Sequence, residues 1–194
     1  TDPYAAPKKP KPAAAGPAPD VPAVKISGPG RYPIVQSSIV FHSNETVWGD
    51  SWAVWWQMPS GTPQYTGIGN WTQLVGHLGT VPNGSLRAIY ISGHGGDGGV
   101  ATKDPTTWLV ATTITPAQAA VIRQKLRPDG VVVLLSCGQA SGAGVALAGG
   151  GTAPYSYASR TRELARTLGV PVIANVGKVS SGNKGAGDWY RFNP

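Results

Sequence analysis

Residues 131–140 read VVVLLSCGQA and hold the only cysteine of the 194-residue chain. A short apolar run without polar alternation predicts a strand in the middle of a sheet that is covered on both faces. Cys137 follows the end of this strand instead of lying within it, and Gly138 comes next. A thiol at this place is expected to leave the core and meet solvent, so Cys137 is a candidate reactive residue.

Strands and helices are predicted to alternate on both sides of this strand. RAIYIS (87–92) and PVIANV (171–176) predict two further strands, with a helix beginning at Thr115 and another over 156–168 between them. This order is typical of a parallel, helix-covered sheet, so we expect an α/β fold with a mostly parallel central sheet and helices on both faces. The remaining predicted elements are strands within 34–42 and 45–56, a helix from 70 to 79 and a last strand at 188–192.

The start of the chain differs in composition from the rest. Residues 1–24 consist mainly of proline, alanine and lysine, which cannot bury a core and favour extended conformations. We therefore assign residues 1–30 to a linker and residues 31–194 to one folded domain. A linker at the start predicts that the domain is the C-terminal module of a longer protein, whose export signal lies upstream of Thr1.

Several classes of protein are disfavoured by composition. One cysteine excludes an internal disulfide and a cysteine-rich metal site, and His42, His77 and His94 lack the close spacing of zinc ligands. We expect no metal and no cofactor, and we interpret His42 and His77 as structural. No run of 18 or more apolar residues is present, so no membrane span is expected. The chain carries a net charge of +7, but no nucleic-acid-binding motif accompanies it.

Two side chains that carry chemistry follow neighbouring predicted strands. His94 comes after the strand at 87–92, and Cys137 comes after the strand at 131–136. The carboxyl ends of parallel strands meet at one edge of a sheet, where active sites gather, so we expect the imidazole and the thiol to lie close together. A thiol needs a base to act as a nucleophile, and His94 is the candidate. The backbone N–H groups of Gly95 and Cys137 are candidates to stabilise an oxyanion.

The segments AIYISGHG and VVVLLSCG, ending in His-Gly and Cys-Gly, resemble the corresponding segments of caspase-like (clan CD) cysteine peptidases. His94 and Cys137 are 43 residues apart, close to the roughly 50 of caspases. The order SCGQA is not the caspase signature. Residues 157–192 are more similar to the self-processing cysteine protease domains of bacterial toxins, and the resemblance covers roughly residues 70–192.

The resemblance implies a three-layer caspase-like fold, with His94 as base, Cys137 as nucleophile and Gly95 at the oxyanion. It implies a cysteine endopeptidase that acts on a protein or peptide, as a C-terminal effector or self-processing domain of a larger secreted or exported protein. It also implies a polyanionic inositol phosphate as an activator, bound to a basic surface near the C-terminal hairpin. Residues 155–194 hold six basic and two acidic residues, a net charge of +4, although a generic basic face explains this equally.

Other interpretations of the same residues stay open. The domain could be a non-catalytic module that binds a partner through its basic face. Cys137 could be a buried small hydrophobic residue, and His94 a loop histidine. Asp97 could orient His94 or serve only as a turn residue. Four tryptophans between Trp48 and Trp56 are a candidate sugar-binding platform, although core packing is the commoner role of such residues.

A dinucleotide-binding domain is a further alternative. Gly93, Gly95 and Gly98 match G-x-G-x-x-G directly after a strand. That fingerprint should open into a helix, whereas the segment GVATKDPTTW (99–108) contains a proline and has no helical stripe. This function is therefore less favoured than a peptidase.

Overall fold

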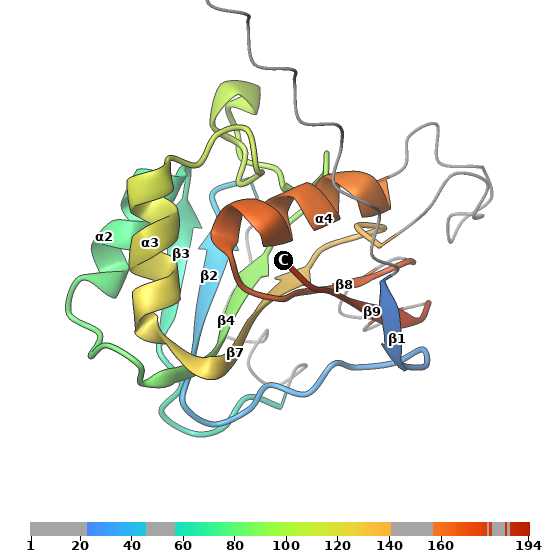
Figure 1. Ribbon diagram of the computed structural model, residues 1–194, viewed down its shortest axis with the longest axis horizontal. Helices are drawn as coiled ribbons and strands as arrows, with labels where there is room; N and C mark the ends of the chain where they lie inside the picture. The colour runs from blue at the N-terminus through green and yellow to red at the C-terminus, as the bar shows by residue number, and fades with distance from the viewer. Residues whose placement is uncertain (1–22, 46–56, 141–156, 178, 180–184, 186) are drawn as a thin grey trace, which may run out of the picture.

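Seven strands form one mixed sheet in the computed structural model, which describes residues 23–45, 57–140, 157–177, 179, 185 and 187–194 (Figure 1). The order across the sheet is β1 (Val24–Ser27), β9 (Trp189–Phe192), β8 (Val172–Asn175), β7 (Leu126–Leu135), β4 (Leu86–Ser92), β2 (Ser38–Ser43) and β3 (Gln64–Ile68). The five strands from β8 to β3 are parallel, and β9 and β1 extend the sheet in antiparallel fashion. The expected α/β fold with a mostly parallel sheet is confirmed.

The helices of the described residues are α2 (Trp71–Leu78), α3 (Pro116–Lys125) and α4 (Tyr157–Leu168), with a short 3-10 helix at Pro105–Thr107. The predicted caps of α2 and α3 are confirmed. Asn70 accepts a hydrogen bond from the N–H of Gln73, and Thr115 forms a capping box with Gln118. Gly169, with φ of 68°, ends α4 as predicted. No helix in the described part of the chain is long and apolar enough to cross a membrane.

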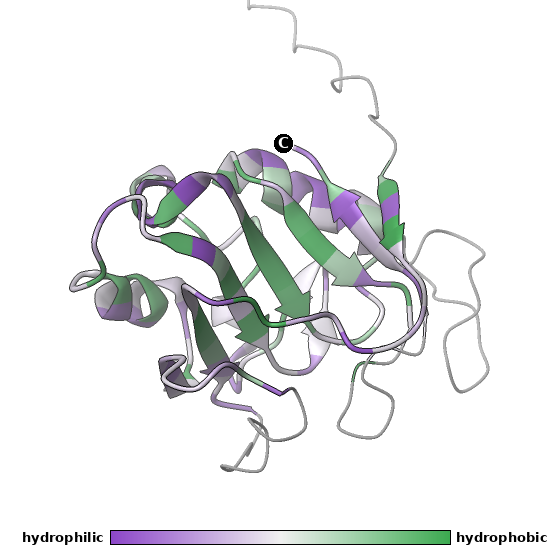
Figure 2. Ribbon diagram, turned by 90° about the horizontal axis from the view of Figure 1, so that it is seen from below, coloured by the Kyte–Doolittle hydropathy of each residue, from purple (hydrophilic) through white to green (hydrophobic). Residues whose placement is uncertain are grey.

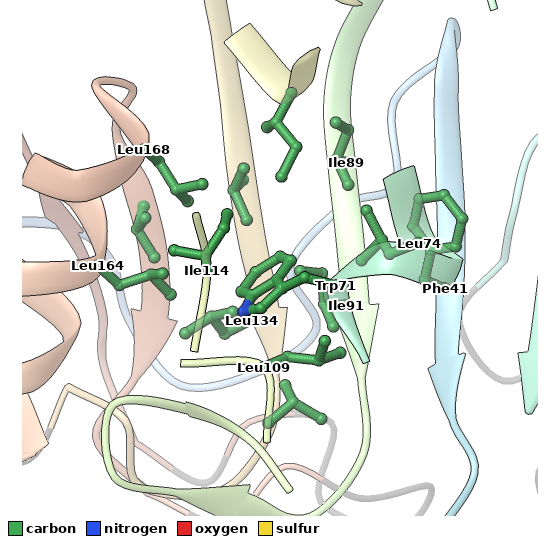
Figure 3. Close-up of a cluster of buried hydrophobic side chains, with 14 of the residues drawn as sticks. Phe41, Trp71, Leu74, Ile89, Ile91, Leu109, Ile114, Leu134, Leu164 and Leu168 are labelled. Carbon is green, nitrogen blue, oxygen red and sulfur yellow. The ribbon is translucent and has the colours of Figure 1, made fainter. Parts of the chain in front are cut away.

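One face of the sheet packs against these three helices. Val132 and Leu134 of β7 point to this face, where the ring of Trp71 lies among apolar side chains from the strands and from the segment before α3 (Figure 3). The indole N–H of Trp71 donates to the carbonyl of Val110 at 3.1 Å, so the ring is fixed by a polar contact as well as by packing.

The opposite face has a different cover. Val133 and Leu135 point to it and pack with Ile34, Val179 and Trp189, none of which belongs to a helix. Helical cover is therefore seen on one face of the sheet, and in the described residues irregular segments cover the other. The central strands are apolar toward both layers, as predicted from residues 131–135 (Figure 2).

Three parts of the sheet differ from the prediction. The strand β1 belongs to the sheet, paired with β9, although residues 24–27 were assigned to the linker. Its four residues, VKIS, alternate apolar and polar side chains, but all four are exposed and directly follow the proline- and alanine-rich segment, so this short alternation was assigned to the linker. The strand β3 was also missed because it is a short edge strand interrupted by Gly67, whose φ is 75°.

The predicted turn at Pro128–Gly130 lies within β7. Leu86 of β4 pairs with Leu126, and Ala88 pairs with Val131, so the intervening residues of β7 bulge out of the ladder. The predicted strand at 45–56, its tryptophans and the linker before residue 23 lie outside the described residues, except for Glu45.

Candidate active site

The ends of β4 and β7 bring the His94 and Cys137 segments together. These strands are parallel neighbours, and Ser92 pairs with Leu135. His94 and Cys137 each lie two residues beyond that pair, so both leave the sheet at its carboxyl edge and at the same level. The predicted adjacency of the two strands is therefore confirmed.

His94 leads into a small β-hairpin. Strand β5 (Gly95–Gly96) pairs with β6 (Gly99–Val100), and the two-residue turn between them is Asp97-Gly98, with φ of 46° and 81°. Two positive φ values and an Asp-Gly sequence are typical of a type I′ turn. The carbonyl of His94 accepts a hydrogen bond from Ala101 at 2.8 Å, and its side chain is exposed. A hairpin stands where a dinucleotide fingerprint needs a helix, so these glycines lack the structural context of that fingerprint.

Gly95 packs directly on the backbone of Cys137. A Cβ placed on Gly95 would overlap the carbonyl oxygen of Cys137 and the Nε2 of Gln139. The partner of Gly95 in the hairpin is Val100, whose N–H and C=O bond to Leu109 on the other side. Because hydrogen-bonded and non-bonded pairs alternate in antiparallel ladders, the N–H of Gly95 points away from β6. This direction suits the predicted oxyanion donor.

The thiol of Cys137 is half-buried and contacts the segment after β8. Its sulfur lies 3.4 Å from the nitrogen and 3.5 Å from the oxygen of Val179. In the part of the chain that the structure describes, the sulfur hydrogen-bonds to Val179 and not to His94.

Gln139 holds the turn that follows the thiol and was missed in the sequence. The residue is fully buried, and its Nε2 donates to the carbonyl of Cys137 at 2.6 Å. The backbone carbonyl of Gln139 accepts a hydrogen bond from the buried hydroxyl of Thr161 on α4 at 2.5 Å. Gln139 thereby fixes the orientation of the Cys137 peptide group. Its only signal in the sequence is a polar residue two positions after the cysteine.

Asp97 contacts helix α4. Its carboxylate lies 3.4 Å from Nε of Arg160, which also pairs with Glu163 at 3.1 Å. The pKa of Arg160 is raised, first by the hydrogen bond to Glu163 and then by the charge of Asp97. The geometry therefore favours the role of turn residue for Asp97 over that of an orienting residue for His94.

The other two histidines fit the structural role expected for them. His42 is buried in β2, its Nε2 lies 3.0 Å from Oε1 of Gln64, and burial lowers its pKa. The ring of His77 stacks on Tyr65 with centroids 4.1 Å apart. No group of three or more potential metal-ligating side chains occurs among the described residues.

Two of the basic residues of 155–194 contact other side chains in the described part of the chain. Arg160 is paired with two carboxylates, and the guanidinium of Arg162 lies 6.0 Å from the ring centroid of Phe192. Lys178 and Lys184 lie outside the described residues.

Neither a scan against protein-family models nor a search of curated proteins finds a match to this chain. The class that the fold and site define is an α/β domain with a histidine and a cysteine at the carboxyl edge of its parallel sheet.

Proposed function

We propose that the domain is a caspase-like cysteine endopeptidase with Cys137 as nucleophile and His94 as general base. The observation that carries the proposal is the register of β4 and β7, which brings both residues to one edge two positions beyond a paired position. Both side chains are at least partly accessible, as a reaction with a peptide requires. The buried side chain of Gln139 binds the backbone carbonyl of Cys137, which gives the cysteine segment the support that a catalytic group needs.

The reaction follows from the chemistry of these groups. His94 takes the thiol proton, and the thiolate forms a C–S bond to the peptide carbonyl carbon. The resulting oxyanion accepts hydrogen bonds from the N–H groups of Gly95 and Cys137. Collapse breaks the C–N bond, and His94 returns its proton to the leaving amine. Water then hydrolyses the thioester with His94 again acting as base, which restores the thiol.

The biological setting is part of the same proposal. The resemblance to toxin-associated protease domains supports a C-terminal effector or self-processing domain of a larger secreted or exported protein. The substrate is a protein or a peptide, and a polyanionic activator is a candidate partner.

The experiment is peptide-library cleavage by the purified domain, with cut sites identified by mass spectrometry. We expect thiol-dependent cleavage that is lost in Cys137→Ser and in His94→Ala. His77→Ala is the control, because that residue is an exposed histidine on α2 remote from the carboxyl edge. Absence of cleavage under every reducing condition, with and without polyanions, contradicts the proposal.

A non-catalytic binding module is the second candidate. The observation that favours it is the contact of the Cys137 sulfur with both backbone groups of Val179. The rate of alkylation near neutral pH separates the two functions. A catalytic thiol reacts faster than a cysteine peptide and slows in His94→Ala, whereas a structural thiol reacts only after denaturation.

A further inference from the structure

A cleft of about 540 Å³ lies beside the candidate dyad. Its walls come from the His94 hairpin, the segment before α3 and the first turn of α4. The residues that line it are Gly95, Gly96, Asp97, Trp108, Tyr157, Ser159 and Arg160. Gly95 also touches the backbone of Cys137, so the cleft and the thiol share a wall.

The position of the cleft relates it to one half of a peptide substrate. Cys137 follows β7, which lies between β4 and β8. His94 follows β4 on one side, and Val179 follows β8 on the other. The imidazole must reach the leaving nitrogen to protonate it, so the leaving half of the substrate lies on the β4 side. The cleft lies between the His94 hairpin and the first turn of α4, and its shared wall with the hairpin is the reason to assign it to that half of the substrate.

The charged residues that line the cleft are Asp97 and Arg160, which form an ion pair. Arg160 also pairs with Glu163, outside the lining, so these three side chains together carry a net charge of −1 in a chain of +7. The carboxylate of Asp97 is about half exposed, at 49%. A carboxylate can accept several hydrogen bonds, so Asp97 retains acceptor capacity beside its single ion pair.

Two aromatic residues complete the lining. The ring of Trp108 packs over Gly96, where a Cβ would lie 2.5 Å from Cζ3, and Tyr157 contributes a second ring. Aromatic faces next to a carboxylate suit a guanidinium, which stacks on rings and forms bidentate hydrogen bonds. Lysine lacks the planar group that would use both features.

We propose that this cleft binds an arginine side chain immediately after the scissile bond. The inference rests on the proposed peptidase function for its place in the substrate, but the binding itself is measurable without cleavage. The guanidinium would lie against the rings of Trp108 and Tyr157 and form an ion pair with the carboxylate of Asp97. Arg160 is then a competitor for the same carboxylate.

The test uses two peptide series that differ only at this position, with arginine or with its neutral isostere citrulline. In the first series, intact peptides are compared by kcat/KM. In the second, short peptides that represent the leaving product, with arginine or citrulline at the N-terminus, are titrated into Cys137→Ser protein and followed by tryptophan fluorescence. We expect a preference for arginine of about tenfold in both measurements.

Two variants change this preference in opposite directions. Asp97→Asn keeps a residue that tolerates positive φ but removes the charge, so the preference should fall to near unity. Arg160→Gln removes the competing guanidinium, so the preference should increase. Asp129→Asn is the control, because this exposed carboxylate lies in the bulge near the opposite end of β7.

The outcomes separate the cleft from the peptidase. Equal binding of arginine and citrulline peptides, a preference for glutamate, or an unchanged preference in Asp97→Asn would each overturn the arginine site. Selective binding of the arginine peptide without cleavage of any peptide supports the cleft and contradicts the peptidase function.

Discussion

Substitution of Gly95 by alanine tests whether the hairpin rests on the cysteine segment as the structure shows. The added Cβ would lie closer than 3.0 Å to the carbonyl oxygen of Cys137 and to Nε2 of Gln139. These two atoms are hydrogen-bonded to each other, and Gln139 is fully buried, so neither can simply turn aside. The hairpin or the cysteine segment must shift instead.

The cost of this shift follows from the packing. Overpacking a rigid site costs about 1–3 kcal/mol, and the involvement of backbone places Gly95→Ala toward the upper end, about 3 kcal/mol. Chemical denaturation measures this loss as a lower midpoint with an unchanged slope. A displacement on the order of 1 Å between His94 and Cys137 would also lower kcat/KM by about 100-fold.

Gly76→Ala is the matched control for this experiment. Gly76 is exposed in α2, and an added Cβ there meets no atom within 4 Å. The same chemical change should stabilise the protein by about 1 kcal/mol, because alanine is the better helix former. If Gly95→Ala were as stable as the wild type and equally reactive at the thiol, the close approach of hairpin and cysteine segment would be refuted.

Three further predictions concern stability and regulation. Burial lowers the pKa of His42 from its ordinary 6.5, so the unfolded chain binds a proton at this residue more readily than the folded protein does. The stabilising contribution of neutral His42 should be full above pH 6.5 and decrease as the pH falls below it. In His42→Gln, the melting temperature should depend less on pH over that window. Thr115→Ala removes the cap of α3 and should lower the free energy of unfolding by about 1 kcal/mol in chemical denaturation. Thr112 is an exposed loop threonine, so Thr112→Ala should change this free energy little. Equal stability of the two variants would contradict the cap. If a polyanion activates the domain, inositol hexakisphosphate at 100 times its dissociation constant should stabilise it by about 2.7 kcal/mol, and no shift of the melting temperature at low salt would leave a generic basic surface.

Elements with a local signal were predictable from the sequence. The first residues of α2 and α3 were predicted from Asn70 and from the Thr115 capping box, and the second half of β7 was predicted from its apolar run at 131–135. The edge strands β1 and β3 have a weaker signal, since each is short and mostly exposed and forms no continuous apolar face. These two strands are held by pairing with strands that are distant in the sequence, and a local sequence pattern does not predict such pairing.

The same distinction applies to the candidate site. The proximity of the His94 and Cys137 segments follows from two strand ends and the parallel sheet, so it was predictable. The contacts of Asp97 with Arg160, and of the thiol with Val179, join residues 63 and 42 positions apart. Their partners are chosen by how α4 and the segment after β8 pack on the sheet edge, and a sequence pattern carries no information on that choice.

The glycine-rich hairpin shows how one pattern can have two physical causes. Glycines after a strand can let a phosphate approach the backbone, which is the basis of the dinucleotide fingerprint. Here they let protein atoms approach: a Cβ at Gly96, Gly98 or Gly99 would collide with Trp108, with Arg160 of α4 or with the backbone of Leu109. These contacts hold the hairpin from several sides, so the glycines make it fixed and not mobile. The backbone that follows His94 is therefore held in place by packed protein atoms, which supports the proposed role of His94 as general base.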